Sequence, residues 1–139
     1  MLPTPKFIAT PKRYLTPVPE FRPYDFEERW SYQQDPWYGM LDIARHPHDV
    51  IESGKGDCVD YARLASSYLY YHTDRPISLY IAFRWNNPPG HIFATDGERV
   101  YSTGSVYEET PEEYGRRTNR AIMFRRTIRG NVGDKIIRL

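Results

Sequence analysis

Proline spacing constrains the first quarter of the chain more than any other feature. Half of the 12 prolines lie before residue 24, at positions 3, 5, 11, 17, 19 and 23. Proline lacks a backbone N–H and clashes with the preceding helical turn, so this segment cannot sustain a helix or form a central strand. We expect residues 1–23 to be an extended arm, partly in polyproline II conformation, ahead of one domain at residues 24–139.

The arm is too apolar for a solvated linker. Its prolines alternate with large apolar side chains, namely Phe7, Ile8, Tyr14, Leu15, Val18 and Phe21. Such side chains are depleted in segments that stay disordered. Two interpretations are open: the arm lies across its own domain, or it binds a partner subunit.

Composition narrows the classes of function. The chain has 139 residues, enough for one domain with a real core. Its 19 Lys and Arg nearly balance its 18 Asp and Glu, so charge gives no argument for binding nucleic acid or an anionic membrane. No apolar run approaches the ~20 residues of a membrane helix, and the N-terminus lacks a secretory signal pattern. We expect a soluble cytoplasmic protein, or a virion-associated one if the source is viral.

A single cysteine limits the chemistry further. Cys58 cannot form an internal disulfide, and one thiolate is too few for a structural zinc site. We expect no metal and no cofactor. Cys58 is therefore either a small buried residue or a reactive thiol.

The order of predicted elements is typical of an α+β fold. Helical spacing precedes alternating spacing along the chain, which indicates helices followed by an antiparallel meander. The predicted helices cover residues 24–34, 37–45, 48–53 and 58–71, and a further helix starts at Thr110-Pro111. A loop is predicted at residues 86–90. The predicted strands cover residues 77–83, 91–95, 98–102, 121–128 and 135–139.

The dipeptide Asp96-Gly97 predicts a tight hairpin between two of these strands. With a two-residue loop, counting back along the strands pairs His91 with Ser102. A three-residue loop pairs His91 with Thr103 instead. Either partner of His91 is a hydroxyl residue.

Cys58 lies where a loop becomes a helix. Asp57 is a good N-cap, so Cys58 falls at the first helical position, and Asp60 lies within the first turn as a helix-face charge or a partner for a neighbouring loop. First-turn N–H groups and the helix dipole favour a thiolate there, and they can also stabilise a developing oxyanion. These features are typical of a cysteine nucleophile.

His91 is the best candidate for the base that such a nucleophile needs. His46 and His48 flank a proline in a loop, and His72 lies at the far end of the cysteine helix, at ~1.5 Å per residue. His91 instead opens a strand after a loop. A sheet packed on the cysteine helix could present it to the thiol.

The stretch Gly56-Asp57-Cys58-Val59-Asp60-Tyr61-Ala62 resembles the transglutaminase-like superfamily of papain-like folds, and the bacterial transglutaminase-like cysteine peptidases are the nearest variety. The resemblance covers roughly residues 37–103 and includes the strand with His91. It implies a cysteine at the start of a central helix packed on an antiparallel sheet, with a histidine base on that sheet.

The same resemblance implies a carboxylate or amide on the adjacent strand to orient the histidine. Here the predicted register supplies Ser102 or Thr103, because Asp96 would lie some 16 Å from His91 at ~3.3 Å per strand residue. A hydroxyl accepts a hydrogen bond from the imidazole but does not stabilise the imidazolium as a carboxylate does. The predicted site is therefore Cys58, His91 and Ser102.

Two functions from different classes follow from this resemblance. The first is a cysteine hydrolase or acyltransferase that acts on an amide of a protein or peptide substrate, either a peptide bond or a glutamine side chain. The second is a catalytically degenerate form of the same fold, serving as a structural module, for example in a virus or phage, whose arm binds neighbouring subunits. We interpret the arginines as a solvated or subunit-facing surface rather than a nucleic-acid site: Arg116, Arg117, Arg120, Arg125, Arg126 and Arg129.

Overall fold

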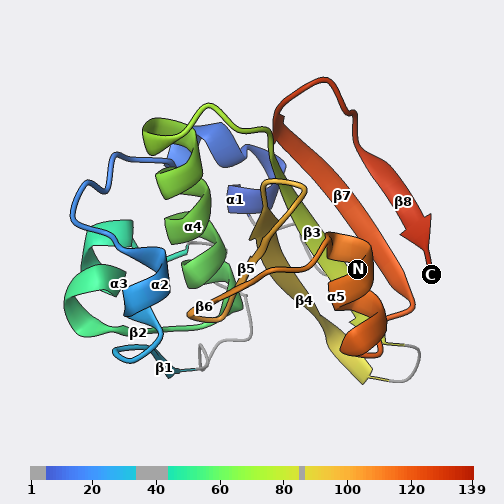
Figure 1. The fold of residues 1–139 in the computed structure, drawn as a ribbon, viewed down its shortest axis with the longest axis horizontal. Helices are drawn as coiled ribbons and strands as arrows, with labels where there is room; N and C mark the ends of the chain where they lie inside the picture. Colours follow the sequence, from blue (N-terminus) through green and yellow to red (C-terminus); the bar gives the residue numbers. More distant parts are fainter. Residues whose placement is uncertain (1–5, 34–43, 85–86) are drawn as a thin grey trace.

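An antiparallel sheet of six strands forms the centre of the computed structural model, which describes residues 6–33, 44–84 and 87–139 (Figure 1). The strands lie in the order β6-β5-β4-β3-β7-β8. Helices precede the sheet along the chain, so the predicted α+β class is confirmed. The strand bounds are β3 Ile77–Arg84, β4 Asn87–Thr95, β5 Val100–Ser102, β6 Ser105–Tyr107, β7 Ile122–Arg129 and β8 Lys135–Arg138.

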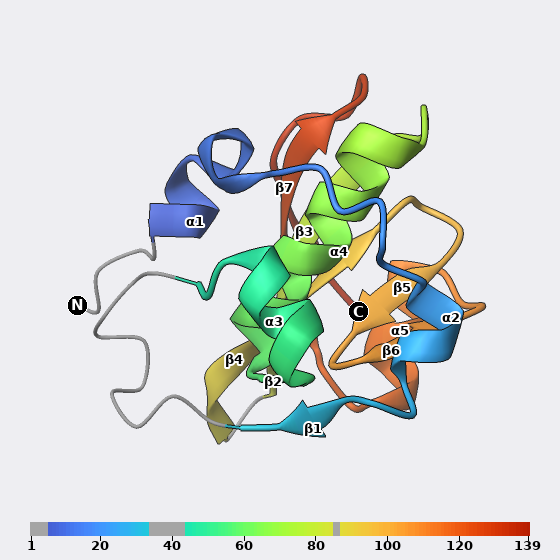
Figure 2. The ribbon, with the colours of Figure 1, turned by 90° about the vertical axis from the view of Figure 1, so that its left-hand side faces the viewer.

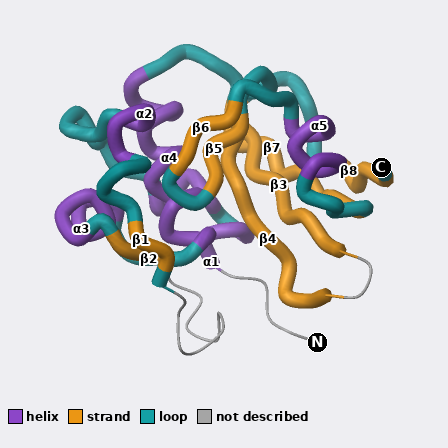
Figure 3. Tube along the Cα trace, turned by 60° about the horizontal axis from the view of Figure 1, so that its bottom comes forward, coloured by secondary structure: helices purple, strands orange, loops and turns teal. Residues whose placement is uncertain are grey.

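Helices cover the sheet on both faces. The longest helix, α4 (Cys58–His72), packs across β4, β3 and β5 on one face. The short helix α5 (Pro111–Arg117) packs on the opposite face (Figures 1 and 3). A capping box between Thr110 and Glu113 starts α5 with a proline at its first position, as the sequence predicts.

Alternation along β4 decides which side chains face which helix. Ile92 is buried in the core under α4, whereas Phe93 is buried against Tyr114 of α5. Residues that pair across two neighbouring antiparallel strands have their side chains on the same face of the sheet. His91 pairs with Ala82, which belongs to the core on the α5 side, so the His91 side chain also lies on the α5 face.

A capping box fixes the start of α4 at Cys58, as the sequence predicts. The Asp57 carboxylate accepts from the Asp60 N–H at 2.9 Å, and the Asp60 carboxylate accepts from the Asp57 N–H at 3.0 Å. The helix ends at His72, one residue beyond its predicted end. Small residues in its stripe let the sheet approach closely. The buried apolar side chains of α4 are Tyr61, Ala62, Leu64, Ala65 and Leu69.

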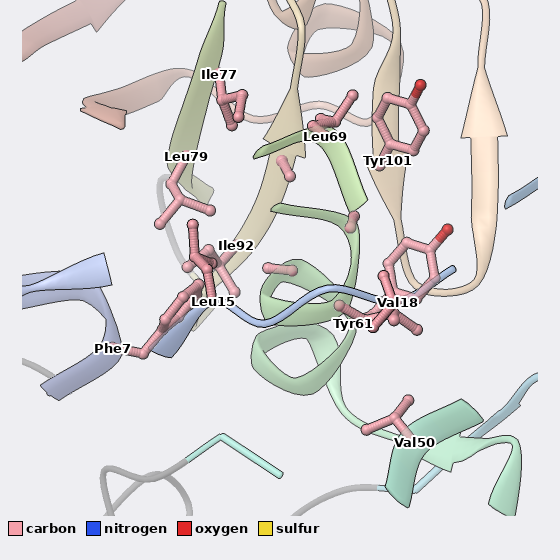
Figure 4. Packing of buried hydrophobic residues seen from close by; sticks show 14 of the residues in the cluster. Phe7, Leu15, Val18, Val50, Tyr61, Leu69, Ile77, Leu79, Ile92 and Tyr101 are labelled. Carbon is pink, nitrogen blue, oxygen red and sulfur yellow. The ribbon is translucent and has the colours of Figure 1, made fainter. Parts of the chain in front are cut away.

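The N-terminal segment packs on its own domain. Phe7 and Val18 are fully buried in the same core as α4, and Figure 4 shows them close to Leu15 and Tyr61. The Val18 N–H donates to His72 Nε2 at 2.9 Å. The segment crosses the outer side of α4 (Figure 2). Of the two interpretations left open by the sequence, the described residues therefore adopt the one in which the segment lies across its own domain.

The expectation of an extended arm holds only in part. The segment contains an α-helical turn, α1 (Lys6–Ala9), and a 3₁₀ turn, η1 (Pro11–Tyr14). Proline at the first position of a helix removes an N–H that has no helical partner, so Pro11 is compatible with the second turn. A division between residues 23 and 24 has no counterpart in the packing, because the core runs across it.

The next predicted helix, over residues 24–34, is much shorter in the structure. It forms only α2 (Pro23–Phe26), which buries Phe26 but leaves Trp30 half-buried beyond its end. A two-residue strand, β1 (Ser31–Tyr32), then pairs in parallel with β2 (Lys55–Gly56). This local pairing with the chain before Cys58 outweighs the weak helical spacing.

Most of the predicted helix at residues 37–45 lies outside the described residues. The helix predicted at residues 48–53 is present as α3 (Pro47–Ser53). Gly54 closes it in the left-handed conformation, with a φ of 70°.

The hairpin register differs from the prediction. Thr95 pairs with Val100, so residues 96–99 form a four-residue loop instead of a tight turn at Asp96-Gly97. The tight turn falls one strand later, at Thr103-Gly104, where φ is 41° and 88°. It adds strand β6, which the sequence did not predict.

Two further boundaries differ less. Strand β4 starts at Asn87 rather than residue 91, because Asn87 pairs with Arg84 of β3 across part of the predicted loop. The last two predicted strands are confirmed as β7 and β8.

Among the described residues, no helix is long and apolar enough to cross a membrane.

Candidate active site

Cys58 begins α4 two residues after a closely packed glycine. A Cβ on Gly56 would lie 2.8 Å from Asp60 Cβ and 3.2 Å from the Trp30 ring, so the motif requires glycine there. The thiol of Cys58 is half-buried. The exposed Tyr32, which pairs with Gly56 across β1 and β2, flanks it.

Burial raises the pKa of the Cys58 thiol above its ordinary value. The backbone N–H of Ile92 and that of Cys58 itself favour the thiolate and act in the opposite direction, while the Asp57 and Asp60 carboxylates raise the pKa further. The N–H at the helix start thus favours the thiolate, as expected, but burial outweighs it and the net pKa of the thiol is raised. The capping carboxylates that build the helix N-terminus also oppose the charge on its thiol.

His91 and Ser102 meet on the α5 face of the sheet. His91 Nε2 lies 2.7 Å from Ser102 Oγ, and Ser102 Oγ lies 2.9 Å from the Tyr114 hydroxyl. Ser102 is fully buried. The three groups form one hydrogen-bonded chain from the imidazole to α5, and this chain holds the ring by its Nε2 atom.

The observed register explains why Ser102 reaches His91 although it is not paired with it. Continuing the pairs Ala94–Tyr101 and Thr95–Val100 places Ser102 opposite Phe93, two residues from His91. A shift of two residues preserves the face of a strand, so Ser102 becomes a diagonal neighbour of His91. Thr103, the alternative, lies in the tight turn instead.

Burial keeps the His91 imidazole neutral, and two arginines add to the effect. Burial and, to a smaller extent, the positive charges of Arg120 and Arg84 together lower the pKa of His91 to about 4. At neutral pH the Cys58 thiol and the His91 imidazole are thus both uncharged. The pair rests as thiol and imidazole rather than as an ion pair.

The thiol approaches β4 next to His91. Cys58 packs against the core under α4, and its thiolate is favoured by the N–H of Ile92, the residue after His91. Within the described residues, β5 pairs with β4 only at Ala94 and Thr95, so β4 has no partner from β5 near His91. The thiol and the imidazole therefore lie on either side of this edge of β4.

No hydrogen bond joins the Cys58 sulfur to the His91 ring in the described part of the chain. The ring uses Nε2 for Ser102, which leaves Nδ1 for another partner. In free enzymes, contacts between a nucleophile and its base are often loose and tighten with substrate. The arrangement can take up the thiol proton at Nδ1 if the ring or the thiol moves around this edge of β4.

The acidic residues near the motif are structural. Asp60 is buried and accepts from the Arg45 N–H at 2.7 Å, so it binds a neighbouring loop as well as capping α4. Asp96 is buried in the β4–β5 loop and binds Arg75 at 2.8 Å. As expected from the sequence, Asp96 does not orient His91.

Sequence reasoning missed Tyr114, Arg84 and Arg120 as neighbours of His91. Only their positions in the sequence could have indicated them. Arg84 and Arg120 lie at the ends of the paired strands β3 and β7, and Tyr114 follows the capping box of α5. The interpretation of the arginines as one solvated surface is also too simple. Arg129, for example, donates to four backbone carbonyls around the end of α4: Leu69, Tyr70, Thr73 and Arg75.

The described residues contain no group of three or more His, Cys, Asp or Glu side chains that could hold a metal ion. Comparisons of this chain with models of known protein families, with curated proteins and with solved structures found no match.

Proposed function

We propose that this protein is a transglutaminase-like cysteine hydrolase or acyltransferase with a papain-like arrangement, acting on an amide of a protein or peptide. One observation carries the proposal. His91 is held through Nε2 by Ser102, beside the strand edge that meets the capped start of α4 and its thiol. A nucleophile, a base and an orienting group thus occupy neighbouring elements.

In the proposed reaction, His91 Nδ1 takes the proton from the Cys58 thiol while the sulfur attacks the carbonyl carbon of the amide. The negative charge that develops on the carbonyl oxygen is stabilised by the Cys58 backbone N–H at the start of α4. His91 then donates its proton to the leaving amine. Water or a second amine resolves the acyl-enzyme, giving hydrolysis or acyl transfer.

Ser102 positions the base without adding charge. It keeps the imidazole oriented through Nε2, and the Tyr114 hydroxyl holds Ser102 in turn. A hydroxyl does not offset the positive charge that His91 acquires during the reaction, and Arg84 and Arg120 oppose that charge. We therefore expect slower turnover than a site with a carboxylate in this position would give.

The second candidate is a catalytically degenerate fold that serves as a structural or assembly module. It is favoured by the raised pKa of the thiol and the lowered pKa of the imidazole, which both disfavour an ion pair. Its proposed means of assembly loses support, because the apolar side chains of the N-terminal segment are buried in their own core. A subunit contact would need another surface.

Trapping of an acyl-enzyme distinguishes the two candidates. The full chain is incubated with a set of N-acetyl-aminoacyl thioesters, and intact-mass analysis followed by peptide mapping locates the acyl group. The proposal expects acylation at Cys58 that hydroxylamine removes, with strong loss in H91A and none in H48A, a control at an exposed histidine. If wild type and H91A are acylated equally slowly, the structural module is the better account.

A further inference from the structure

Arg84 and Arg120 converge on one point beside His91. Arg84 follows the part of β3 that pairs with His91, and Arg120 precedes β7. Each guanidinium donates to the same carbonyl oxygen, that of Thr118, over 3.3 Å for Arg84 and 3.5 Å for Arg120. Both contacts are long, and most of the guanidinium N–H donors have no partner among the described residues.

Neither arginine has an acidic partner among the described residues. Some other arginines of the described chain do pair with carboxylates, such as Arg117 with Glu109 and Arg126 with Asp134. Arg84 and Arg120 instead repel each other and lower the pKa of His91. Two close cations with only a shared carbonyl oxygen are a poor arrangement unless an anion joins them.

The two arginines lie close enough to the active-site residues to act on their charges. The positive charge of Arg120 interacts with Cys58 as well as with His91, so the guanidinium lies within electrostatic reach of both. Arginine binds carboxylate groups through two parallel hydrogen bonds, which fixes the orientation of the bound group. An anionic group bound there would stand next to the carbonyl that Cys58 attacks.

We propose that Arg84 and Arg120 form an anion subsite that selects substrates with a carboxylate beside the reacting amide, such as an acidic side chain or a peptide C-terminus. This substrate class rests on the proposed function. A carboxylate bound there offsets the two positive charges that oppose protonation of His91. The substrate itself thus supplies the negative charge that Ser102 lacks.

Paired alkylating reagents test the subsite at the thiol. Iodoacetate and iodoacetamide both form a bond from the Cys58 sulfur to carbon and release iodide, but only iodoacetate carries a carboxylate. After correction for their intrinsic rates on a free thiol, the subsite predicts about tenfold faster alkylation by iodoacetate. R84Q and R120Q should each remove most of this preference. R13Q, at an exposed arginine in η1 with the same change of charge, should keep it.

Glutarate and glutaramide test binding without alkylation. The Nε–H resonances of Arg84 and Arg120 should shift on titration with glutarate and not with glutaramide. Inorganic phosphate, used as a second anion, should compete more weakly than glutarate; equal or stronger competition would overturn the assignment to a carboxylate.

Failure of the anion subsite and failure of the proposed function give different experimental results. Absence of both the iodoacetate preference and glutarate binding overturns the subsite but leaves the proposed function, which requires only alkylation of Cys58 by iodoacetamide that depends on His91. If Cys58 instead reacts with iodoacetamide at the same rate with and without His91, the proposed function fails, and the substrate assignment fails with it.

Discussion

His91 Nε2 lies 2.7 Å from the Oγ of Ser102, a fully buried serine that is itself bound to Tyr114. The contact orients the ring but brings no negative charge to it. Burial and two nearby arginines keep the imidazole neutral, with a pKa of about 4. The Cys58 thiol and the His91 imidazole therefore form a neutral pair at neutral pH.

A carboxylate at position 102 should restore charge to the imidazole. In S102D, the new carboxylate favours the imidazolium, so the pKa of His91 should rise by about 2. S102N is the matched control, with the same shape and no charge, and should leave the pKa near that of wild type. NMR titration of the His91 ring measures it. An equal pKa in both variants would show that Ser102 does not control the charge on His91.

Removal of the Asp57 charge should make the thiol more acidic. Burial raises the pKa of Asp57 to about 6, and its carboxylate in turn raises the pKa of Cys58. D57N keeps a good N-cap, so the helix start should persist while the thiol pKa falls. The Cβ chemical shift of the only cysteine, followed against pH, reports the change. D49N, in the first turn of α3, should leave it unaltered.

His91 should make the protein less stable in acid. Its pKa falls from 6.5 when unfolded to about 4 in the native state, so only the unfolded chain binds this proton between those values. Stability is therefore lost as pH falls from about 6.5 to 4, by roughly 3 kcal/mol. Urea unfolding should show H91N losing less stability than wild type over this range.

The comparison with H91N isolates the effect of this one group. Asp57 acts in the opposite direction, since its raised pKa adds stability as pH falls through about 6, but it does so in both proteins. A constant difference in unfolding free energy between wild type and H91N across the range would contradict the buried neutral imidazole.

The N-terminal segment should be essential for stability. F7A and F21A each remove a ring buried in the core and should cost about 3–5 kcal/mol in the free energy of unfolding. Y24A, at a tyrosine that is 61% exposed, should cost far less. Denaturant titration measures all three. A small loss in F7A and F21A would indicate an arm that is free to bind elsewhere.

Local chemistry made part of the fold predictable. Asp57 and Thr110 each indicate a helix start, because each side chain accepts a hydrogen bond from the backbone N–H only three residues later. The position of Cys58 at the first residue of α4 follows from the same rule. The strand with His91 was predicted because it flanks the turn signal Asp96-Gly97, although the observed loop there is longer.

Long-range contacts decided the features that the sequence did not predict. The Asp96 carboxylate binds the N–H groups of Glu98 and Arg99 and the distant Arg75, which favours a four-residue loop over a tight turn. The pKa of Cys58 likewise depends on burial against the sheet, which the helix start alone does not reveal. Tyr114 joins the site only through the packing of α5.

The pH dependence of Cys58 alkylation by iodoacetamide tests the central claim, that Cys58 and His91 act as a pair, most directly. Moving a proton from thiol to imidazole leaves the pair's total protonation unchanged. The wild-type rate should therefore be nearly constant from about pH 5 to 8, between the lowered pKa of His91 and the raised pKa of Cys58. In H91A the rate should rise about tenfold per pH unit, as for an isolated thiol. A wild-type rate that rises in the same way and overlays H91A would contradict the account.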